Sequence, residues 1–224
     1  MTNPDHIEMG VLRVLTLDDP EDVSHHGRVI ERNFPHVSTT SHCIPDHPDG
    51  IPDVESEADA VPYVEELGRE MAADVDVLGV SCALDPAVDS LDADLDVPVV
   101  GAGASVAAAA LARGERVGTL GLESGTPPNV ADLLGDRLAA SEVVVGAETT
   151  NFLTTDGGRK AILASVERLA DAGCDVVAPS CTGLTTSGAL ADLGDSLEIP
   201  VVDPVVAMGA MGTTAVTPTG PVAE

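Results

Sequence analysis

The hydrophobic pattern of the chain contains one arrangement twice. An apolar run over residues 74–80 ends at Ser81-Cys82, and a later run over residues 173–179 ends at Ser180-Cys181. Each is followed by a polar segment and then by a second short apolar run. Short apolar runs bounded by polar segments are typical of buried strands. The pattern therefore predicts a buried strand in each half of the chain, and both strands end at a Ser-Cys pair.

Strand-like runs alternate with segments of helical spacing along the rest of the chain, and Pro45–Asp53 is a proline-rich loop. We expect further strands at Val11–Leu17, Val37–Cys43, Val97–Gly101, Arg116–Leu122, Ser141–Val145 and Ile199–Val202. We expect helices at Asp22–Asn33, Ala58–Ala73, Ala102–Arg113, Pro127–Ala140, Arg159–Ala172, Ser187–Leu193 and from Asp203-Pro204 to about Met211. Strands that alternate with helices in this way predict an α/β fold with parallel sheets.

The repeat also predicts how the chain is divided. We expect one lobe over residues 1–100 that carries Cys82 and a second over residues 101–200 that carries Cys181. Residues 201–224 would hold a C-terminal helix that returns to the first lobe, followed by a loose tail from Thr213. Because ligands of open parallel sheets bind at the carboxyl ends of strands, both Ser-Cys pairs are expected to face one cleft.

Charge narrows the classes of partner. The 224 residues include 10 Lys+Arg and 38 Asp+Glu, which gives a formal net charge of −28. Such a surface repels nucleic acids and anionic membranes, so we expect neither as a partner. Its many small carboxylates are typical of proteins kept soluble in concentrated salt, where self-repulsion is screened, and we expect a halophilic source.

Targeting signals and disulfides are not indicated. There is no apolar stretch long enough for a membrane span and no basic-then-apolar N-terminal signal, so we expect a cytoplasmic protein. Four cysteines without paired spacing do not form a disulfide framework.

Two thiols on opposite walls of a cleft suggest acid–base chemistry. A free thiol has a pKa of about 8.5, and nearby backbone N–H groups favour the thiolate. Thr182-Gly183, directly after Cys181, suits such a turn of donors. One sulfur could remove a proton from a carbon next to a carboxylate or carbonyl, and the other could return one to the opposite face. This chemistry requires neither a metal nor a cofactor.

Other interpretations of the cysteines stay open. Free cysteine is often core filler, which is the favoured interpretation of Cys174 and Cys43. A redox disulfide between Cys82 and Cys181 is also conceivable, although a reducing cytosol disfavours it.

The cysteine segments belong to a longer set of motifs. In chain order these are Ser81-Cys82-Ala83-Leu84-Asp85-Pro86, Val97-Pro98-Val99-Val100-Gly101, Arg116-Val117-Gly118, Asp175-Val176-Val177 and Ser180-Cys181-Thr182-Gly183. Together they resemble the Asp/Glu/hydantoin racemase superfamily, over most of residues 10–210. The Asp-Pro after the first cysteine is more similar to hydantoin racemases than to glutamate racemases, which typically have Asn-Thr where this chain has Ala83-Leu84.

The resemblance implies two pseudo-symmetric lobes, each a mainly parallel sheet flanked by helices, with the active-site cleft between them. It implies cofactor-independent racemisation with Cys82 and Cys181 as the acid/base pair, acting on a small anionic or imide substrate that is hydantoin-like or amino-acid-like. The residues it implies for substrate binding are Thr39, Thr40, Ser41, Ser81, Ala83, Thr182 and Gly183.

Two other functions fit the same scaffold. One is cis–trans isomerisation of a maleate-type diacid, in which one cysteine attacks the double bond. The other is small-molecule binding without catalysis.

Metal and cofactor sites are not indicated by the remaining motifs. The histidines of residues 25–47 match no standard zinc spacing, so we expect no metal. Gly101-Ala102-Gly103 lacks the third glycine of a dinucleotide-binding motif, and Lys160 at a helix start is expected to be exposed rather than to hold a pyridoxal group. The apolar segment Val205–Met211 could provide a surface for a homo-oligomer.

Overall fold

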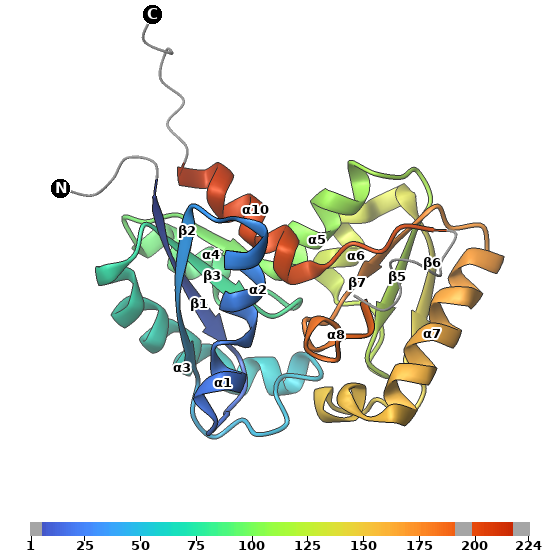
Figure 1. The fold of residues 1–224 in the computed structure, drawn as a ribbon, viewed down its shortest axis with the longest axis horizontal. Helices are drawn as coiled ribbons and strands as arrows, with labels where there is room; N and C mark the ends of the chain where they lie inside the picture. The colour runs from blue at the N-terminus through green and yellow to red at the C-terminus, as the bar shows by residue number, and fades with distance from the viewer. Residues whose placement is uncertain (1–5, 191–198, 217–224) are drawn as a thin grey trace, which may run out of the picture.

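The computed structural model describes residues 6–190 and 199–216, which form two lobes of α/β structure (Figure 1). The first lobe contains a four-stranded sheet of order β2-β1-β3-β4, and the second a three-stranded sheet of order β6-β5-β7. Every strand pair is parallel. The predicted two-lobe α/β fold is therefore confirmed.

The first lobe is built from the N-terminal half of the chain. Its strands are β1 (Ile7–Arg13), β2 (Val37–Cys43), β3 (Val77–Ser81) and β4 (Val99–Gly101). Its helices are α1 (Pro20–Val23), α2 (His25–Asn33), α3 (Val54–Met71) and α4 (Val88–Asp94), with a short 3₁₀ turn, η1 (Ala72–Asp74). All five residues of β3 are buried, as the continuous apolar run predicts.

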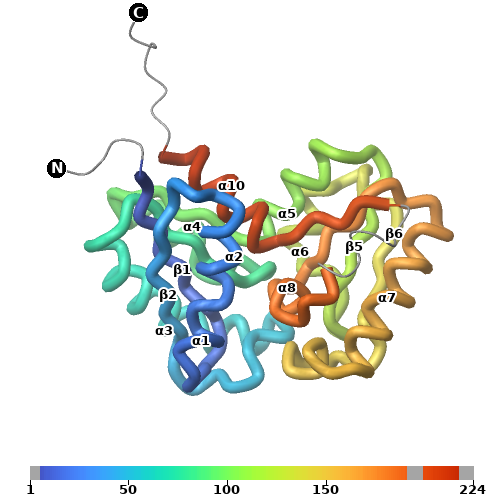
Figure 2. Tube along the Cα trace, viewed as in Figure 1, coloured from blue at the N-terminus to red at the C-terminus, as the bar shows by residue number. Residues whose placement is uncertain are grey.

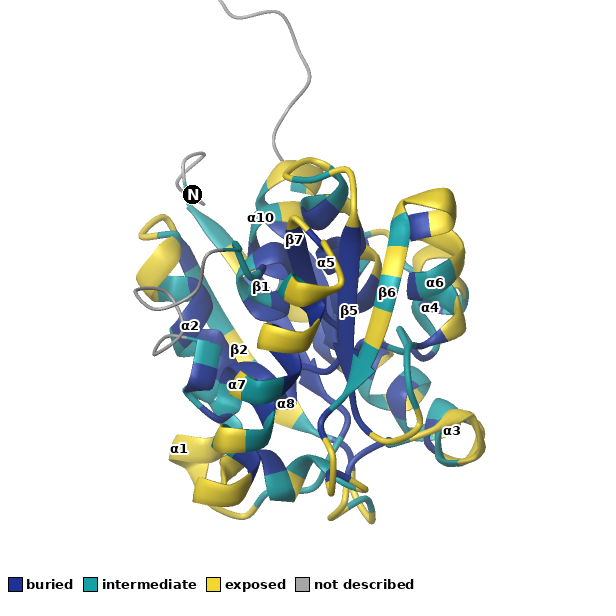
Figure 3. Ribbon diagram, turned by 90° about the vertical axis from the view of Figure 1, so that its right-hand side faces the viewer, coloured by how far each residue is buried: buried dark blue, intermediate teal, exposed yellow. Residues whose placement is uncertain are grey.

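The second lobe repeats this plan on a smaller scale. Its strands are β5 (Val117–Gly121), β6 (Leu138–Val143) and β7 (Val176–Pro179). Its helical elements are α5 (Ala102–Leu111), α6 (Pro128–Leu134), η2 (Gly135–Arg137), η3 (Thr150–Thr154), α7 (Asp156–Asp171) and α8 (Gly183–Thr186). The strands β5 and β7 are buried throughout, whereas β6 forms a partly exposed edge (Figure 3).

The last helix, α10 (Pro204–Val216), returns the chain to the first lobe. The segment before it runs back from the second lobe (Figure 2), where Val201 forms a parallel bridge with Val177. In α10, Val205 and Met208 are fully buried in one cluster with residues of β1 and β3. A Cβ on Gly79 of β3 would lie 3.1 Å from the sulfur of Met208, so glycine lets the helix approach the sheet closely. These apolar side chains are thus covered within the chain itself.

Several strands and helices begin or end at residues other than those predicted from the sequence. The first strand lies at Ile7–Arg13 rather than Val11–Leu17, and the helix predicted at Asp22–Asn33 is split at Ser24 into α1 and α2. Helix α6 ends at Leu134 because Gly135 adopts a φ of +51°, and β6 begins soon afterwards.

The C-terminal prediction is tested only in part. Thr213 belongs to α10, which continues to Val216, so the tail does not begin there. The rest of the predicted tail and the end of the helix predicted at Ser187–Leu193 lie outside the described residues.

Asp85 joins the loop after β3 to the start of α5. Its carboxylate oxygens accept hydrogen bonds from the backbone N–H groups of Gly103 and Ala104, each at 2.7 Å. The amide of Asn129 donates to the same carboxylate at 3.1 Å and to the carbonyl oxygen of Ala83 at 3.0 Å. Burial raises the pKa of Asp85 to about 6. The Asp-Pro of the first cysteine motif therefore has a structural role, which is to hold the Cys82 loop against the second half of the chain.

Replacing Asp85 with alanine should lower the free energy of unfolding by about 2–3 kcal/mol, because two helix N–H groups and the Asn129 amide lose their acceptor. Urea unfolding followed by circular dichroism measures this. Asp89→Ala, an exposed position in α4, is the matched control and should change the value by less than about 0.5 kcal/mol. Equal effects of the two substitutions would contradict the role given to Asp85.

Candidate active site

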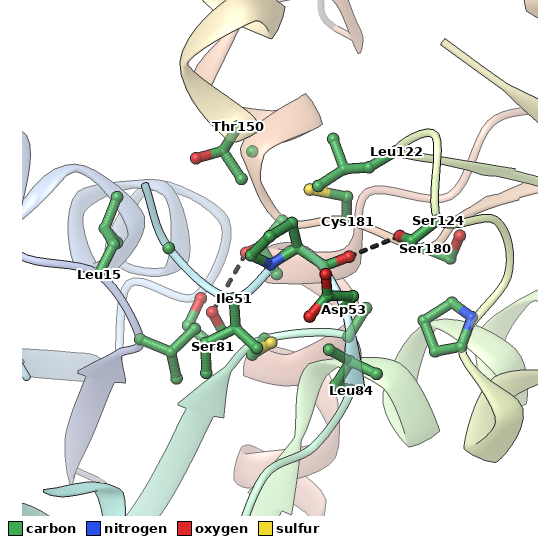
Figure 4. A pocket seen from close by; sticks show the side chains of 18 of the residues that line it. Leu15, Ile51, Asp53, Ser81, Leu84, Leu122, Ser124, Thr150, Ser180 and Cys181 are labelled. Atoms are coloured by element: carbon green, nitrogen blue, oxygen red, sulfur yellow. Dashed lines mark hydrogen bonds between the residues drawn. The ribbon is translucent and has the colours of Figure 1, made fainter. Parts of the chain in front are cut away.

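A cavity of about 790 Å³ lies between the two lobes, and both cysteines of the repeated motif line it. The first lobe contributes the carboxyl ends of β1 and β3 and residues 50–55, which are the end of a loop and the start of α3. The second lobe contributes the segments after β5 and β7 and residues of η3. Figure 4 shows Ser81 on one side of the cavity and Cys181 on the other. The cavity thus lies at the carboxyl ends of strands from both sheets.

Cys82 and Cys181 occupy matching positions on the cavity wall. Cys82 directly follows β3 and is 6% exposed, and Cys181 follows β7 and is 8% exposed. The two sulfurs lie close enough for the charge of one to raise the pKa of the other. The structure therefore brings together the two thiols that the repeat singled out.

Burial makes the two thiols unequal acids. Desolvation raises the pKa of Cys181 to about 11, although the backbone N–H groups of Gly183 and Leu184 partly offset this. Desolvation raises the pKa of Cys82 further still, and the nearby charge of Asp85 acts in the same direction. The expectation that backbone donors would bring a thiol pKa toward neutrality is wrong here, because desolvation is the larger effect for both. Cys181 is the more readily ionised of the pair.

Buried hydrogen bonds connect the two cysteine segments. His26 of α2 bridges the lobes, since its Nδ1 lies 2.8 Å from the hydroxyl of Ser81 and its Nε2 lies 2.8 Å from that of Thr186 in α8. The hydroxyl of Thr182 donates to the carbonyl oxygen of Ser81 at 3.1 Å. Burial lowers the pKa of His26 well below its ordinary value, so the imidazole is neutral at pH 7. Ser81, the residue before Cys82, is thus bound directly to Thr182, which precedes α8, and through His26 to Thr186, the last residue of α8.

Two buried hydroxyls on the cavity wall have no hydrogen-bond partner among the described residues. They belong to Ser180, which precedes Cys181, and to Thr150 in η3. Because buried donors are nearly always paired, both are candidates to donate to oxygen atoms of a ligand. The Ser-Cys repeat gives a signal for Ser180, whereas no sequence pattern marks Thr150.

Four of the substrate-binding residues implied by the resemblance line the cavity: Ser81, Ala83, Thr182 and Gly183. The hydroxyls of Ser81 and Thr182 already take part in the bonds between the lobes. Gly183 packs tightly, since an added Cβ would lie 3.0 Å from Leu153 and 3.2 Å from Thr150.

The structure does not bring the other three, Thr39, Thr40 and Ser41, to the cavity. The Thr39 hydroxyl donates to Glu31 at 3.0 Å, and Ser41 faces Gly27 of α2. Thr40 points to the opposite side of the sheet, into a separate hollow against α3. The physical reason is that β2 is an edge strand whose side chains alternate between α2 and α3, whereas the cavity lies beyond the ends of β1 and β3.

The proline-rich loop of the first lobe reaches across the cavity to the second lobe. The hydroxyl of Ser124 donates to the carbonyl oxygen of Pro52 at 2.5 Å (Figure 4). The amide of Asn151 lies 3.4 Å from a carboxylate oxygen of Asp49. The predicted loop thus forms part of the cavity wall.

The remaining cysteines and histidines lie in separate places. Cys174 is buried in the core of the second lobe, Cys43 is half-buried at the end of β2, and both are free thiols. His25 lines the cavity, whereas His47 contacts the ring of Tyr63. Within residues 6–190 and 199–216, no three His, Cys, Asp or Glu side chains are grouped as metal ligands. No helix in this part of the chain has the length and apolarity needed to cross a membrane.

Comparison with known proteins places this geometry in context. The family model described as Asp/Glu/Hydantoin racemase matches residues 28–211. Among curated proteins, no sequence matches the chain.

Several solved structures share the fold. An allantoin racemase from Klebsiella pneumoniae has a TM-score of 0.73 at 19% identity, with 93% of this chain and 86% of that chain covered. The allantoin racemase AllR from Pseudomonas fluorescens has a TM-score of 0.74 at 17% identity, with coverage of 97% and 100%. A glutamate racemase from Aquifex pyrophilus has a TM-score of 0.59 at 18% identity, with coverage of 93% and 83%. At sequence identities of 17–19%, the similarity of these structures to this chain shows a shared fold.

The buried imidazole of His26 should make stability depend on pH. Its pKa is lower in the folded chain than in the unfolded chain, so its contribution is complete above pH 6.5 and is lost as the pH falls below that value. Relative to a His26→Gln variant, the native protein should lose about 1.4 kcal/mol of unfolding free energy per pH unit below 6.5. Urea unfolding from pH 7.5 down to about 5.5 measures the difference. The exposed His36→Gln variant should follow the native protein, and parallel curves for all three proteins would refute the assignment.

Proposed function

The chain belongs to the Asp/Glu/hydantoin racemase family, and on this basis we propose that it is a cofactor-independent racemase or epimerase that uses Cys82 and Cys181 as its acid/base pair. One observation carries the proposal. Two thiols from matching strand ends of the two lobes line the same cavity, and Cys181 lies close enough to raise the pKa of Cys82. An acid and a base on opposite sides of one carbon atom are what inversion of a stereocentre requires.

The unequal acidities suggest how the step proceeds. The thiolate of Cys181 removes a proton from a carbon next to a carboxylate or carbonyl group, and the electron pair moves onto the neighbouring oxygen. The thiol of Cys82 then donates its proton to the opposite face of the same carbon. In the reverse direction, the thiolate of Cys82 is the base and Cys181 is the acid. Protons and electrons balance without a further reactant.

The negative oxygen of the intermediate needs hydrogen-bond donors. The buried hydroxyls of Ser180 and Thr150 have no partner among the described residues and line the cavity on the side of Cys181. Donors already in place cost no reorganisation when charge develops. We assign to these two hydroxyls the stabilisation of the enolate-like oxygen.

The substrate class proposed is a small hydantoin-like or amino-acid-like carbon acid. The names of the structurally similar proteins include both kinds, allantoin and glutamate. A cavity of about 790 Å³ accommodates either, since small-molecule sites commonly measure roughly 300–1,000 Å³.

Replacing either Cys82 or Cys181 with serine should lower the rate of enantiomer interconversion by at least about 100-fold, because one proton carrier is lost. A polarimetric screen of hydantoins, aspartate, glutamate and maleate in high salt identifies the reactive compound. Proton NMR in deuterium oxide then shows whether solvent deuterium enters at the stereocentre. Cys174→Ala, a buried cysteine outside the cavity, is the matched control and should retain the rate.

Other outcomes would point to the competing functions. A covalent adduct on one cysteine with maleate, detected by mass spectrometry, would favour cis–trans isomerisation. Binding by the native protein without deuterium incorporation would favour a non-catalytic binding protein. Full interconversion by either serine variant would contradict the two-thiol mechanism.

The pH dependence of kcat/KM should report the ionisation of Cys181 in the free enzyme. Because burial raises its pKa to about 11, only a small fraction is thiolate at neutral pH. We expect kcat/KM to rise about tenfold per pH unit between about pH 7 and pH 10, where Cys181 is still mostly protonated. Initial rates over this range, with unfolding monitored in parallel, test the expectation. A flat profile between about pH 7 and 9 would show that the base is already ionised.

A further inference from the structure

Arg13 is a buried cation on the wall of the cavity. It is 3% exposed and is the last residue of β1. In the sheet register it lies opposite Ser81 of β3, so the next residue along that neighbouring strand is Cys82. Adjacent strands are about 4.8 Å apart, and an arginine side chain is longer than this. The Arg13 side chain therefore lies on the same face of the sheet as that of Ser81, and Arg13 lines the same cavity as Cys82.

Among the described residues, only one nitrogen of the guanidinium, Nη1, has a hydrogen-bond partner. Nη1 donates to the carbonyl oxygens of Asp22, at 2.9 Å, and Val23, at 3.3 Å. Nε is buried and has no hydrogen-bond partner among the described residues. The bonds to α1 fix the plane of the guanidinium and leave the Nε side free, which is the side that can bind a carboxylate with two parallel hydrogen bonds.

Arg13 also has no ion-pair partner in residues 6–190 and 199–216. Four other arginines, Arg28, Arg69, Arg137 and Arg168, each form an ion pair with a carboxylate. Within the part of the chain that the structure describes, no carboxylate forms an ion pair with Arg13, although Asp22 and Cys43 act on it at longer range. Desolvation lowers the pKa of Arg13 to about 10, so the group is still charged at neutral pH.

A buried charge without a partner costs free energy, and an unpaired cation is unusual in a chain so rich in carboxylates. The chain has 38 Asp+Glu against 10 Lys+Arg, so carboxylates are abundant everywhere else. Buried cations are normally paired. An anion supplied from outside the chain would complete the pairing at Arg13.

We propose that Arg13 binds a carboxylate group of the substrate, so that this chain acts on anionic carbon acids in preference to neutral hydantoins. The reaction on such a substrate rests on the proposed function, whereas the anion site itself does not. Three carboxylates, those of Asp22, Asp53 and Glu55, also belong to residues of the cavity wall. The carboxylates of Asp53 and Glu55 disfavour an anionic group beside residues 50–55, whereas the charge of Asp22 acts on Arg13 itself.

The strong negative charge of the protein does not oppose this assignment at high salt. At about 1 M salt, interactions between exposed charges fade within roughly 3 Å, whereas a direct contact with a buried group is screened much less. Local contact with Arg13 therefore outweighs repulsion by the acidic surface in the concentrated salt that the composition leads us to expect.

Two pairs of probes that differ only in charge test the proposal: hydantoin-5-acetate against hydantoin-5-acetamide, and aspartate against asparagine. Isothermal titration calorimetry at one fixed salt concentration measures their affinities. The native protein should bind the carboxylate member of at least one pair about 10- to 100-fold more tightly than the amide. Arg13→Gln should abolish this preference and leave the affinity for the amide unchanged, while Arg69→Gln, an exposed arginine, should behave like the native protein.

A second variant guards against loss of folding. If Arg13→Gln does not fold, Arg13→Lys keeps the charge but removes the paired donors, and it should lower the affinity for the carboxylate member alone. Equal affinities for carboxylate and amide in the native protein, equal losses for both in the Arg13 variant, or no binding of either pair would each overturn the proposal.

Exchange of the carbon-bound proton, followed by NMR in deuterium oxide in the same samples, separates this proposal from the proposed function. A carboxylate preference that depends on Arg13, without exchange, would leave the anion site standing and reject the racemase. Exchange of the carbon-bound proton without a preference for the carboxylate probe would support the racemase and reject the anion site.

Discussion

The hydrogen bonds that join the two cysteine segments fix the geometry on which the rest of the site depends. Ser81 accepts from Thr182 through its carbonyl oxygen and is bound through its hydroxyl to His26, which in turn reaches Thr186. Breaking any of these bonds would leave a buried polar group unpaired, which costs about 1–3 kcal/mol. The lobes are therefore held so that the residues next to both cysteines keep one relative position. A mechanism with one base on each face of a carbon requires this fixed position, because a small displacement of a reacting group lowers the rate strongly.

Burial of the thiols gives the site its chemical character. Exclusion of water raises the pKa of Cys181 to about 11 and that of Cys82 further, so few thiolates form at neutral pH. A thiolate whose conjugate acid is that weak is in turn a stronger base than an exposed cysteine thiolate. The same exclusion of water leaves Arg13 without solvent as a partner and strengthens any bond it makes to an anion. Low dielectric therefore acts on both the reacting groups and the proposed substrate contact.

The sequence predicted those features that depend on local pattern. The apolar runs ending at Ser81-Cys82 and Ser180-Cys181 identified the central strands, and strand ends in parallel sheets meet at one edge, so the pairing of the cysteines could be expected. Thr39, Thr40 and Ser41 were misplaced because nothing in a strand pattern states whether the strand is central or at the edge of its sheet. The role of Arg13 was also hidden. One arginine within an apolar run gives no sign of a binding role, and only the sheet register shows that it lies beside Ser81. The position of His26 between Ser81 and Thr186, and that of Thr150 on the cavity wall, depend on segments distant in sequence, which periodicity does not record.

The most direct test of the account is a crystal structure with a non-reactive substrate analogue bound in the cavity. Two thiols that exchange protons with one carbon should contact its opposite faces, which places their sulfurs roughly 6–8 Å apart with the carbon between them. A ligand that touches only one of the two sulfurs, or that binds outside the cavity between the lobes, would contradict the account.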